Sequence, residues 1–243
     1  MNPTIVQFYP DASKSLIALT EALLVSVAAR TRKPFYLALS GGETARRLFE
    51  LWRIRYHEPA RWKNVHFFWV DERCVPPDSE ESNFYWAERL FFKPVGISPD
   101  RIYRIRGEEP PGHEAERYAR LIAERLPDCN GVPRFDCTLL GIGEDEHVAS
   151  IFGNAPGLLQ SDDLYAVSQH PATGQYRVTQ TGEVILASRE ILIALVGERK
   201  KELLHRLVSR QEPAATPAAY ILSHTTRATI FTEIELHSRD LSL

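Results

Sequence analysis

Short apolar runs alternate with amphipathic segments along most of this chain, and this alternation constrains the fold more than any other feature. An apolar run bounded by Pro or Gly is typical of a strand buried on both faces, and apolar residues at helical spacing are typical of a helix face. Strands are predicted at about 34–39, 65–70, 135–140, 165–167, 176–181, 191–196 and 228–231. Helices are predicted at about 13–30, 43–55, 83–92, 115–126, in a short piece at 147–152, and from Gly197 onward.

This order of elements predicts an α/β fold with a mainly parallel, doubly wound sheet and helices on both faces. The chain has no internal repeat, low-complexity tract or long linker, so a single domain over 1–243 is expected. Hydrophobic residues make up 44% and charged residues 25%, which excludes a disordered chain, a coiled coil and a collagen-like repeat.

Charge and cysteine content limit which binding partners, metal sites and cellular compartments are expected. The net charge of −3 lacks the basic footprint that nucleic acid or an anionic membrane requires, although a local site for a small anion is allowed. The three cysteines, an odd number with no C-x-x-C, argue against a disulfide framework and a structural zinc site. The N-terminus lacks a signal-peptide pattern, and no apolar run approaches the length of a transmembrane helix. The cysteine usage indicates a reduced, intracellular compartment, so a cytoplasmic protein is expected, and we also expect it to be a monomer.

The first candidate site is Ser40-Gly41-Gly42-Glu43-Thr44, between a predicted strand and a predicted helix. Ligands of open α/β sheets bind beyond the carboxyl ends of the strands. Glycines let the backbone approach an anion, the helix N-terminus offers free N–H groups, and Ser40 and Thr44 add hydroxyl donors. The segment is neither a dinucleotide-binding fingerprint nor a Walker loop, and a plain tight turn is the alternative.

The second candidate is Asp71-Glu72-Arg73, at the end of the next strand. Burying three charges is costly, so they are predicted to lie at the surface or in a polar cleft. The alternative is a solvated loop, with Ser82 capping the following helix.

The third candidate is His147, which follows two glycines and three carboxylates after the strand at 135–140. Such a histidine can serve as a general base, although a loop histidine can also be merely exposed. Arg177 and Lys200 are candidate anion binders, with a solvated surface as the alternative. The other histidines show no metal-ligand spacing, and no G-x-S-x-G elbow occurs, so neither a metal site nor an α/β-hydrolase is expected.

Taken in order, these segments resemble 6-phosphogluconolactonases, whose superfamily also contains the glucosamine-6-phosphate isomerases. The resemblance covers about residues 37–200 and rests on 37–42, 70–75, Ser82-Asn83, 140–145, His147, 149–152, 177–179 and 197–200. It implies an α/β fold around a mainly parallel sheet. It also implies hydrolysis of 6-phospho-D-glucono-1,5-lactone to 6-phosphogluconate in the pentose phosphate pathway, without a metal or organic cofactor.

The resemblance also implies roles for individual residues. His147 would be the general base that activates water, and Arg73 would bind substrate or stabilise the developing oxyanion. Asp71 and Asp145 match polar positions of the family, and either could orient His147. The residues implied to bind the substrate phosphate are Ser40, Gly41, Gly42, Thr44, Arg177 and Lys200.

The chain departs from the family pattern at three places. Glu146 stands where members usually have Gly, which indicates a positive φ or close ligand approach, so Glu146 is expected to reshape the loop or add negative charge beside the substrate. Gly153 stands where Pro is frequent, and Thr232-Glu233 where Asp is usual.

Two other functions stay open. The isomerases carry a Phe-Asn-Glu-Pro type segment with a catalytic Glu after the His, and this chain has Ile-Phe-Gly-Asn at 151–154. A non-catalytic sugar-phosphate binder is motivated by Glu146.

Overall fold

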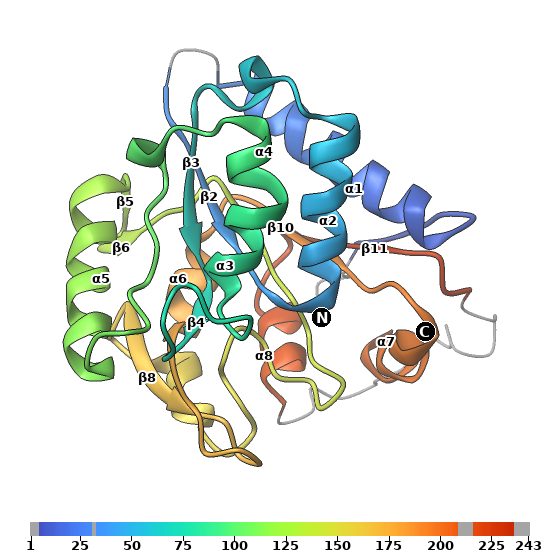
Figure 1. Cartoon of the computed structure of the whole chain (residues 1–243). Helices are drawn as coiled ribbons and strands as arrows, with labels where there is room; N and C mark the ends of the chain where they lie inside the picture. Colours follow the sequence, from blue (N-terminus) through green and yellow to red (C-terminus); the bar gives the residue numbers. More distant parts are fainter. Residues whose placement is uncertain (1–4, 31–32, 209–215, 236–243) are drawn as a thin grey trace.

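The computed structural model describes residues 5–30, 33–208 and 216–235. Within them, six strands form a central sheet in the order β1-β11-β10-β7-β2-β3, and every neighbouring pair is parallel (Figure 1). This confirms the predicted mainly parallel sheet. The strands are β1 Ile5–Phe8, β2 Phe35–Leu39, β3 Val65–Trp69, β7 Cys137–Leu139, β10 Ile191–Ala194 and β11 Ala228–Thr232.

A second, antiparallel sheet lies beyond the end of β3, in the order β4-β9-β8. Its strands are β4 Asp71–Arg73, β8 Tyr165–Gln169 and β9 Tyr176–Gln180, and a small hairpin joins β5 Asp128–Cys129 to β6 Val132–Pro133. The register sets Arg73 opposite Arg177 and Asp71 opposite Thr179. This pairing brings together two charged segments that are far apart in the sequence.

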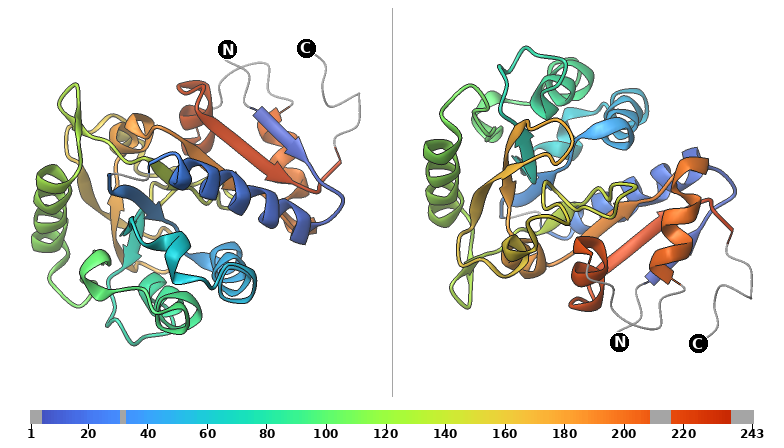
Figure 2. Two further views of the ribbon diagram at one scale, coloured as in Figure 1. Left: turned by 90° about the horizontal axis from the view of Figure 1, so that it is seen from above. Right: turned by 90° about the horizontal axis from the view of Figure 1, so that it is seen from below.

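Helices cover both faces of the central sheet, as predicted. α1 packs against β10 and β11, and Figure 2 shows α7 and α8 on the opposite face of β11. The helices are α1 Ala12–Ala28, α2 Gly42–Arg55, α3 Asn83–Ala87, α4 Lys93–Val95, α5 Pro111–Arg125, α6 Gly182–Ala187, α7 Lys201–Val208 and α8 Pro217–Ser223. Short 3₁₀ turns occupy Pro59–Trp62, Pro99–Arg101, Pro156–Gln160 and Glu198–Lys200, and Glu88–Phe92 forms a π-helical turn between α3 and α4.

Local sequence explains where the helices begin. Asp11 caps α1 by accepting the backbone N–H of Lys14 at 2.8 Å, and the apolar stripe of α1 is buried. Proline occupies the first turn of α5, where a missing N–H costs nothing. α2 differs because Gly41 supplies no side-chain cap, so the first-turn amides of α2 receive no side-chain acceptor.

Two predictions are wrong. Residues 147–152 form no helix, because Glu146 and Ala149 adopt left-handed backbone (φ 65° and 54°) and Val148 instead forms isolated bridges to Ile142 and Ile151. Glu72 lies neither at the surface nor in a cleft, since it is only 2% exposed and its carboxylate is saturated by hydrogen bonds.

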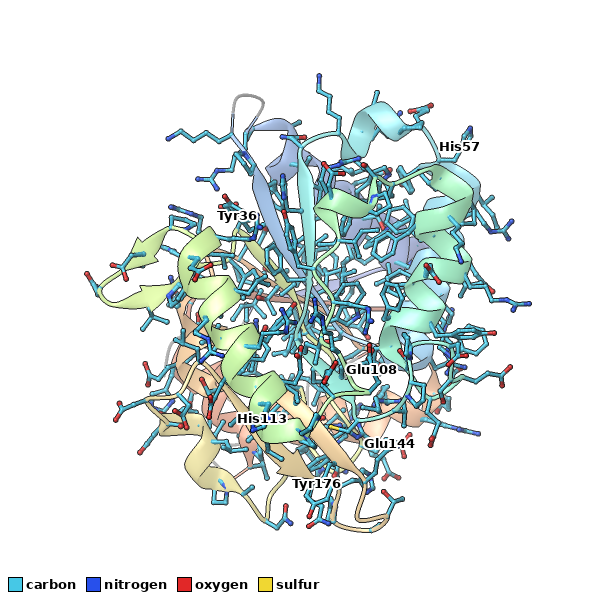
Figure 3. The ribbon with its side chains drawn as sticks, turned by 60° about the vertical axis from the view of Figure 1, so that its left-hand side comes forward. Tyr36, His57, Glu108, His113, Glu144 and Tyr176 are labelled. Carbon is cyan, nitrogen blue, oxygen red and sulfur yellow. The ribbon has the colours of Figure 1, made fainter. Side chains whose placement is uncertain are left out.

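The polar ends of the strands gather at one end of the molecule. Glu144 and Tyr176 lie at the end opposite Tyr36 and His57 (Figure 3). One buried apolar cluster extends from α1 and α2 through the central sheet and supports this end of the molecule. The core therefore holds the loops after β2, β3, β7 and β10 on a rigid base.

Candidate active site

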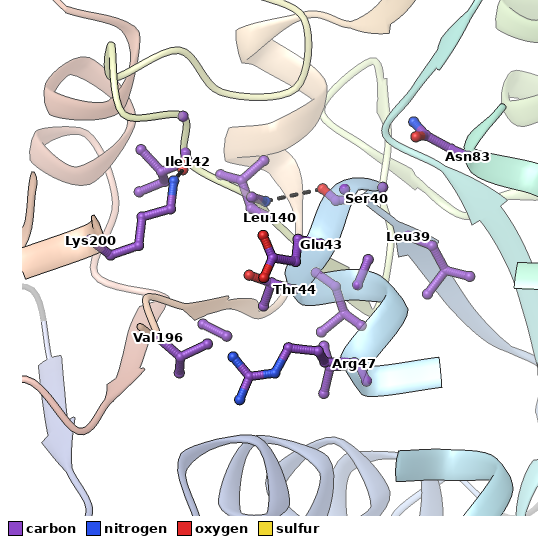
Figure 4. Close-up of a pocket in the computed structure, with 18 of the residues that line it drawn as sticks. Leu39, Ser40, Glu43, Thr44, Arg47, Asn83, Leu140, Ile142, Val196 and Lys200 are labelled. Atoms are coloured by element: carbon purple, nitrogen blue, oxygen red, sulfur yellow. Dashed lines mark hydrogen bonds between the residues drawn. The ribbon is translucent and has the colours of Figure 1, made fainter. Parts of the chain in front are cut away.

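A cleft of about 640 Å³ opens beyond the carboxyl ends of β2, β7 and β10 (Figure 4). Nearly all residues predicted from the sequence line it. They are Ser40, Gly41, Gly42, Thr44, Asp71, Arg73, His147, Arg177 and Lys200. Asp145 is outside this lining and contacts His147 instead.

His147 and Asp145 form a close pair at the cleft. The Nδ1 atom of His147 lies 2.5 Å from Oδ1 of Asp145. Burial raises the pKa of Asp145, but the charge and hydrogen bonds of His147 outweigh it and hold that pKa below its usual value. An ionised carboxylate only accepts, so Nδ1 carries the hydrogen and Nε2 is left for proton transfer. Of the two carboxylates considered for this role, Asp145 is the one in contact.

Gly143 makes room for this pair. A Cβ atom at residue 143 would lie 2.5 Å from Oδ1 of Asp145 and closer still to two ring atoms of His147. The turn is closed by backbone bonds between Gly143 and both His147 (2.9 Å) and Glu146 (3.0 Å). Position 143 therefore needs glycine for a steric reason, which the sequence pattern alone does not reveal.

Glu146 adopts the positive φ that the departure from the family pattern indicated. Its carboxylate is buried, and it accepts hydrogen bonds from Arg206 Nε at 2.9 Å and Thr216 Oγ1 at 2.7 Å. The expectation that Glu146 adds negative charge beside the substrate does not fit this placement, because Glu146 is not among the residues that line the cleft.

Asp71 and Arg177 lie together on the neighbouring sheet. Ser150 Oγ donates to Asp71 Oδ2 at 2.6 Å, and Arg177 Nη1 is 4.0 Å from the same oxygen. Asn83 donates from Nδ2 to the backbone oxygen of Asp71 at 2.9 Å. Burial and then the positive charge of Arg73 lower the pKa of Arg177. These contacts place two guanidinium groups and one carboxylate on one wall of the cleft.

Two hydrogen bonds hold Arg73 in place, one from its backbone and one from its guanidinium. Its backbone N–H donates to Glu72 Oε1 at 2.8 Å, and its Nη1 donates to the backbone oxygen of Glu81 at 2.7 Å. The Nε–H of Arg73 is buried and has no hydrogen-bond partner within the part of the chain that the structure describes. Burial raises the pKa of Glu72, and four hydrogen bonds oppose that rise. The buried Glu72 therefore anchors the loop that presents Arg73.

The turn after β2 and the start of α2 are suited to an anion. The uncapped start of α2 faces the cleft, and Ser40 Oγ accepts the N–H of Gly141 at 3.0 Å, which joins the turn after β2 to the turn after β7. Lys200 Nζ donates to the backbone oxygen of Ile142 at 2.7 Å. Burial lowers the pKa of Lys200, while Glu144, Asp145 and Glu43 oppose that shift.

Several residues in or beside the cleft were given no individual role from the sequence. Glu43 and Arg47 of α2 line the cleft, and Asn83 lies against Gly41, where a Cβ atom would collide with its amide. His170 contacts Phe152, whose ring also packs on His147 with centroids 4.8 Å apart. Glu43 and Asn83 lie within the quoted segments 40–44 and 82–83, whereas Arg47 and His170 lie outside every segment singled out from the sequence, and only spatial proximity reveals them.

Within the described residues, no group of three or more His, Cys, Asp or Glu is arranged to hold a metal ion. None of the described helices combines the length and apolar character needed to cross a membrane.

Comparison with known proteins decides the family. Residues 10–231 match the model of the family described as glucosamine-6-phosphate isomerases/6-phosphogluconolactonase. The chain belongs to this family. It is 41% identical to the 6-phosphogluconolactonase of Treponema pallidum (strain Nichols), over 77% of this chain and 79% of that protein. It is 33% identical to the 6-phosphogluconolactonase of Haemophilus influenzae, over 88% and 90%. The crystal structure of 6-phosphogluconolactonase from Leishmania guyanensis superposes with a TM-score of 0.82 at 26% identity, covering 95% of this chain and 96% of that one.

The remaining two departures from the glucosamine-6-phosphate isomerase/6-phosphogluconolactonase pattern are accommodated locally. A Cβ atom at Gly153 would meet open space, so nothing nearby requires glycine there. Glu233 accepts the N–H of Gly197 at 2.7 Å and so helps to fix the turn that leads to Lys200.

Proposed function

We propose that this protein hydrolyses 6-phospho-D-glucono-1,5-lactone to 6-phosphogluconate in the pentose phosphate pathway. The observation that carries the proposal is the His147–Asp145 pair on a cleft that also presents two arginines and a lysine. The 6-phosphogluconolactonases among the relatives support the choice of substrate.

In the proposed mechanism, His147 is the general base. Asp145 holds the Nδ1–H tautomer, so Nε2 accepts a proton from water as the oxygen of that water attacks the lactone carbonyl carbon. The C1–ring oxygen bond then breaks, and the imidazolium returns its proton to the leaving ring oxygen. The carboxylic acid product ionises, and one proton is released to solvent in each turnover.

Arg73 stabilises the oxyanion that forms at the carbonyl oxygen. Its guanidinium lines the cleft, and Nη1 of that guanidinium is held by the backbone oxygen of Glu81. A fixed donor of this kind costs little reorganisation in the transition state. Asp71 orients Arg177 and, through Ser150, the segment after His147.

The substrate phosphate binds at the turn 40–42. The first-turn N–H groups of α2, the hydroxyl of Thr44 and the ammonium of Lys200 supply donors, and Arg177 adds a second positive charge to the cleft. The helix N-terminus contributes a partial positive charge that favours an anion.

We further propose that the enzyme works as a cytoplasmic monomer on this small substrate, without a nucleic-acid or membrane partner. The net charge of −3 and the free state of Cys74, Cys129 and Cys137 support this setting.

The test compares three ligands on the wild-type protein. Proton release on freshly generated lactone, above the spontaneous rate, supports the proposal. Deamination of glucosamine 6-phosphate would replace it with the isomerase activity, and binding of 6-phosphogluconate without turnover of either compound would replace it with the binding function.

A further inference from the structure

Glu146 separates the two residues of the His147–Asp145 pair and adopts a left-handed backbone conformation. This conformation is unfavourable for any residue with a Cβ atom, so the surrounding structure must hold it in place. The side chain of Glu146 makes the contacts that do this.

Both carboxylate oxygens of Glu146 accept hydrogen bonds, one from a residue of α7 and one from the N-cap of α8. Arg206 of α7 donates from Nε to Oε1 at 2.9 Å, and Thr216, the N-cap of α8, donates from Oγ1 to Oε2 at 2.7 Å. The carboxylate is 5% exposed, so these bonds are made away from bulk water, where they are strong.

Hydrogen bonds to backbone oxygens of the same turn add to this attachment. Arg206 also donates from Nη2 to the backbone oxygen of Glu144 at 2.8 Å. Ala218 donates its N–H to the backbone oxygen of Glu146 at 3.0 Å. The segment 144–146 is thus fixed to α7 and α8 by residues that lie outside the cleft lining.

We propose that Glu146 is a positioning residue: its carboxylate anchors the turn between Asp145 and His147 to α7 and α8, and this anchor sets the geometry of the His147–Asp145 pair. The inference rests on the proposed function for its kinetic consequences but not for its structural one. Glu146 does not line the cleft, so it acts through its neighbours rather than on the substrate.

The decisive variant is Glu146→Gly, which relieves the backbone strain and removes the anchor at once. In this variant kcat falls about tenfold to a hundredfold, because the His147–Asp145 pair loses its geometry. KM stays within about twofold, because the groups that bind the substrate are unchanged. Arg206→Met cuts the anchor from the other side and gives the same split. The double variant loses no more than Glu146→Gly alone, since the two residues act as one unit. Glu146→Gln keeps the size and part of the hydrogen bonding and falls in between.

The matched control is Arg117→Met. Arg117 donates to Glu114, another buried carboxylate, at 2.7 Å, and the pair lies on α5 outside the cleft lining. This variant loses thermal stability but keeps kcat. A fall in kcat equal to that of Arg206→Met would show that general destabilisation explains the effect, and would overturn the proposal.

A spectroscopic readout separates this inference from the proposed function. The Nδ1 proton of His147, bonded to Asp145, gives a far-downfield proton resonance, which is assigned by its loss in His147→Gln. The resonance weakens or shifts in Glu146→Gly and Arg206→Met, and persists in Arg117→Met, whatever substrate the enzyme uses. An unchanged resonance with unchanged kcat in Glu146→Gly would refute the anchor.

Discussion

Replacing Gly143 with alanine should disable the active site while leaving the fold intact. The φ of Gly143 is not left-handed, so the backbone accepts alanine, but the new methyl group would lie 2.5 Å from Asp145 Oδ1 and closer to the His147 ring. An ordinary contact for such a methyl begins at 3.4 Å, so the His147–Asp145 pair must move by about 1 Å. A displacement of this size costs about a hundredfold in rate, or about 2.7 kcal/mol of transition-state stabilisation.

The assay is proton release from the lactone, with thermal unfolding measured in parallel. Gly153→Ala is the matched control, because a methyl group at residue 153 meets open space. We expect the control to keep wild-type activity and both variants to keep a similar unfolding temperature. If Gly143→Ala turns over substrate within threefold of wild type, the crowding around His147 does not constrain the base and the reasoning fails.

Three further substitutions test the same site. Asp145→Asn should lower kcat about a hundredfold or more by freeing the wrong imidazole tautomer. The pKa of Asp145 is lower in the folded than in the unfolded protein, so its ionised carboxylate stabilises the fold above the ordinary pKa of 3.8, and this contribution is lost as the pH falls through the folded-state pKa. The difference in unfolding temperature between wild type and Asp145→Asn should therefore shrink on acidification. A difference that stays constant with pH would contradict this prediction. Lys200→Met should raise KM for the phosphorylated lactone about tenfold or more and leave KM for unphosphorylated glucono-1,5-lactone unchanged, whereas equal effects on both substrates would argue against a phosphate contact. Arg73→Met should lower kcat/KM by about 10²–10³-fold, chiefly through kcat, and a purely KM effect would assign Arg73 to binding instead.

The central elements of the fold were predictable because they are long or strongly apolar. β2, β3 and β10 are nearly continuous apolar runs, and α1 carries a regular buried stripe. β1 escaped prediction because it lies at the sheet edge and is mostly exposed, so it carries no burial pattern. α6 and α8 are too short for helical spacing to stand out.

The location of the site was predictable from one rule of parallel sheets. Ligands of open α/β sheets bind beyond the carboxyl ends of the strands, and the segments after β2, β3, β7 and β10 do line one cleft there. Motif order then indicated which residues carry the chemistry.

Side-chain partners were not predictable, because they depend on distant segments. Asp145 rather than Asp71 is the partner of His147, a choice that depends on how the loops after β3 and β7 fold. The sequence left open whether Glu146 reshapes the loop or adds charge beside the substrate. Its carboxylate bonds Arg206 and Thr216, which are 60 and 70 residues away in the sequence. Local pattern carries no information about such contacts.

Proton release on fresh 6-phosphogluconolactone should be measured for wild type and for His147→Ala, at near-neutral pH with the spontaneous rate subtracted, because it tests the lactonase activity and the general base together. We expect turnover by wild type and a loss of about 10²–10⁴-fold in a folded His147→Ala. Turnover that survives in the variant would reject His147 as the base, and a folded wild type with no rate above background would contradict the lactonase activity itself.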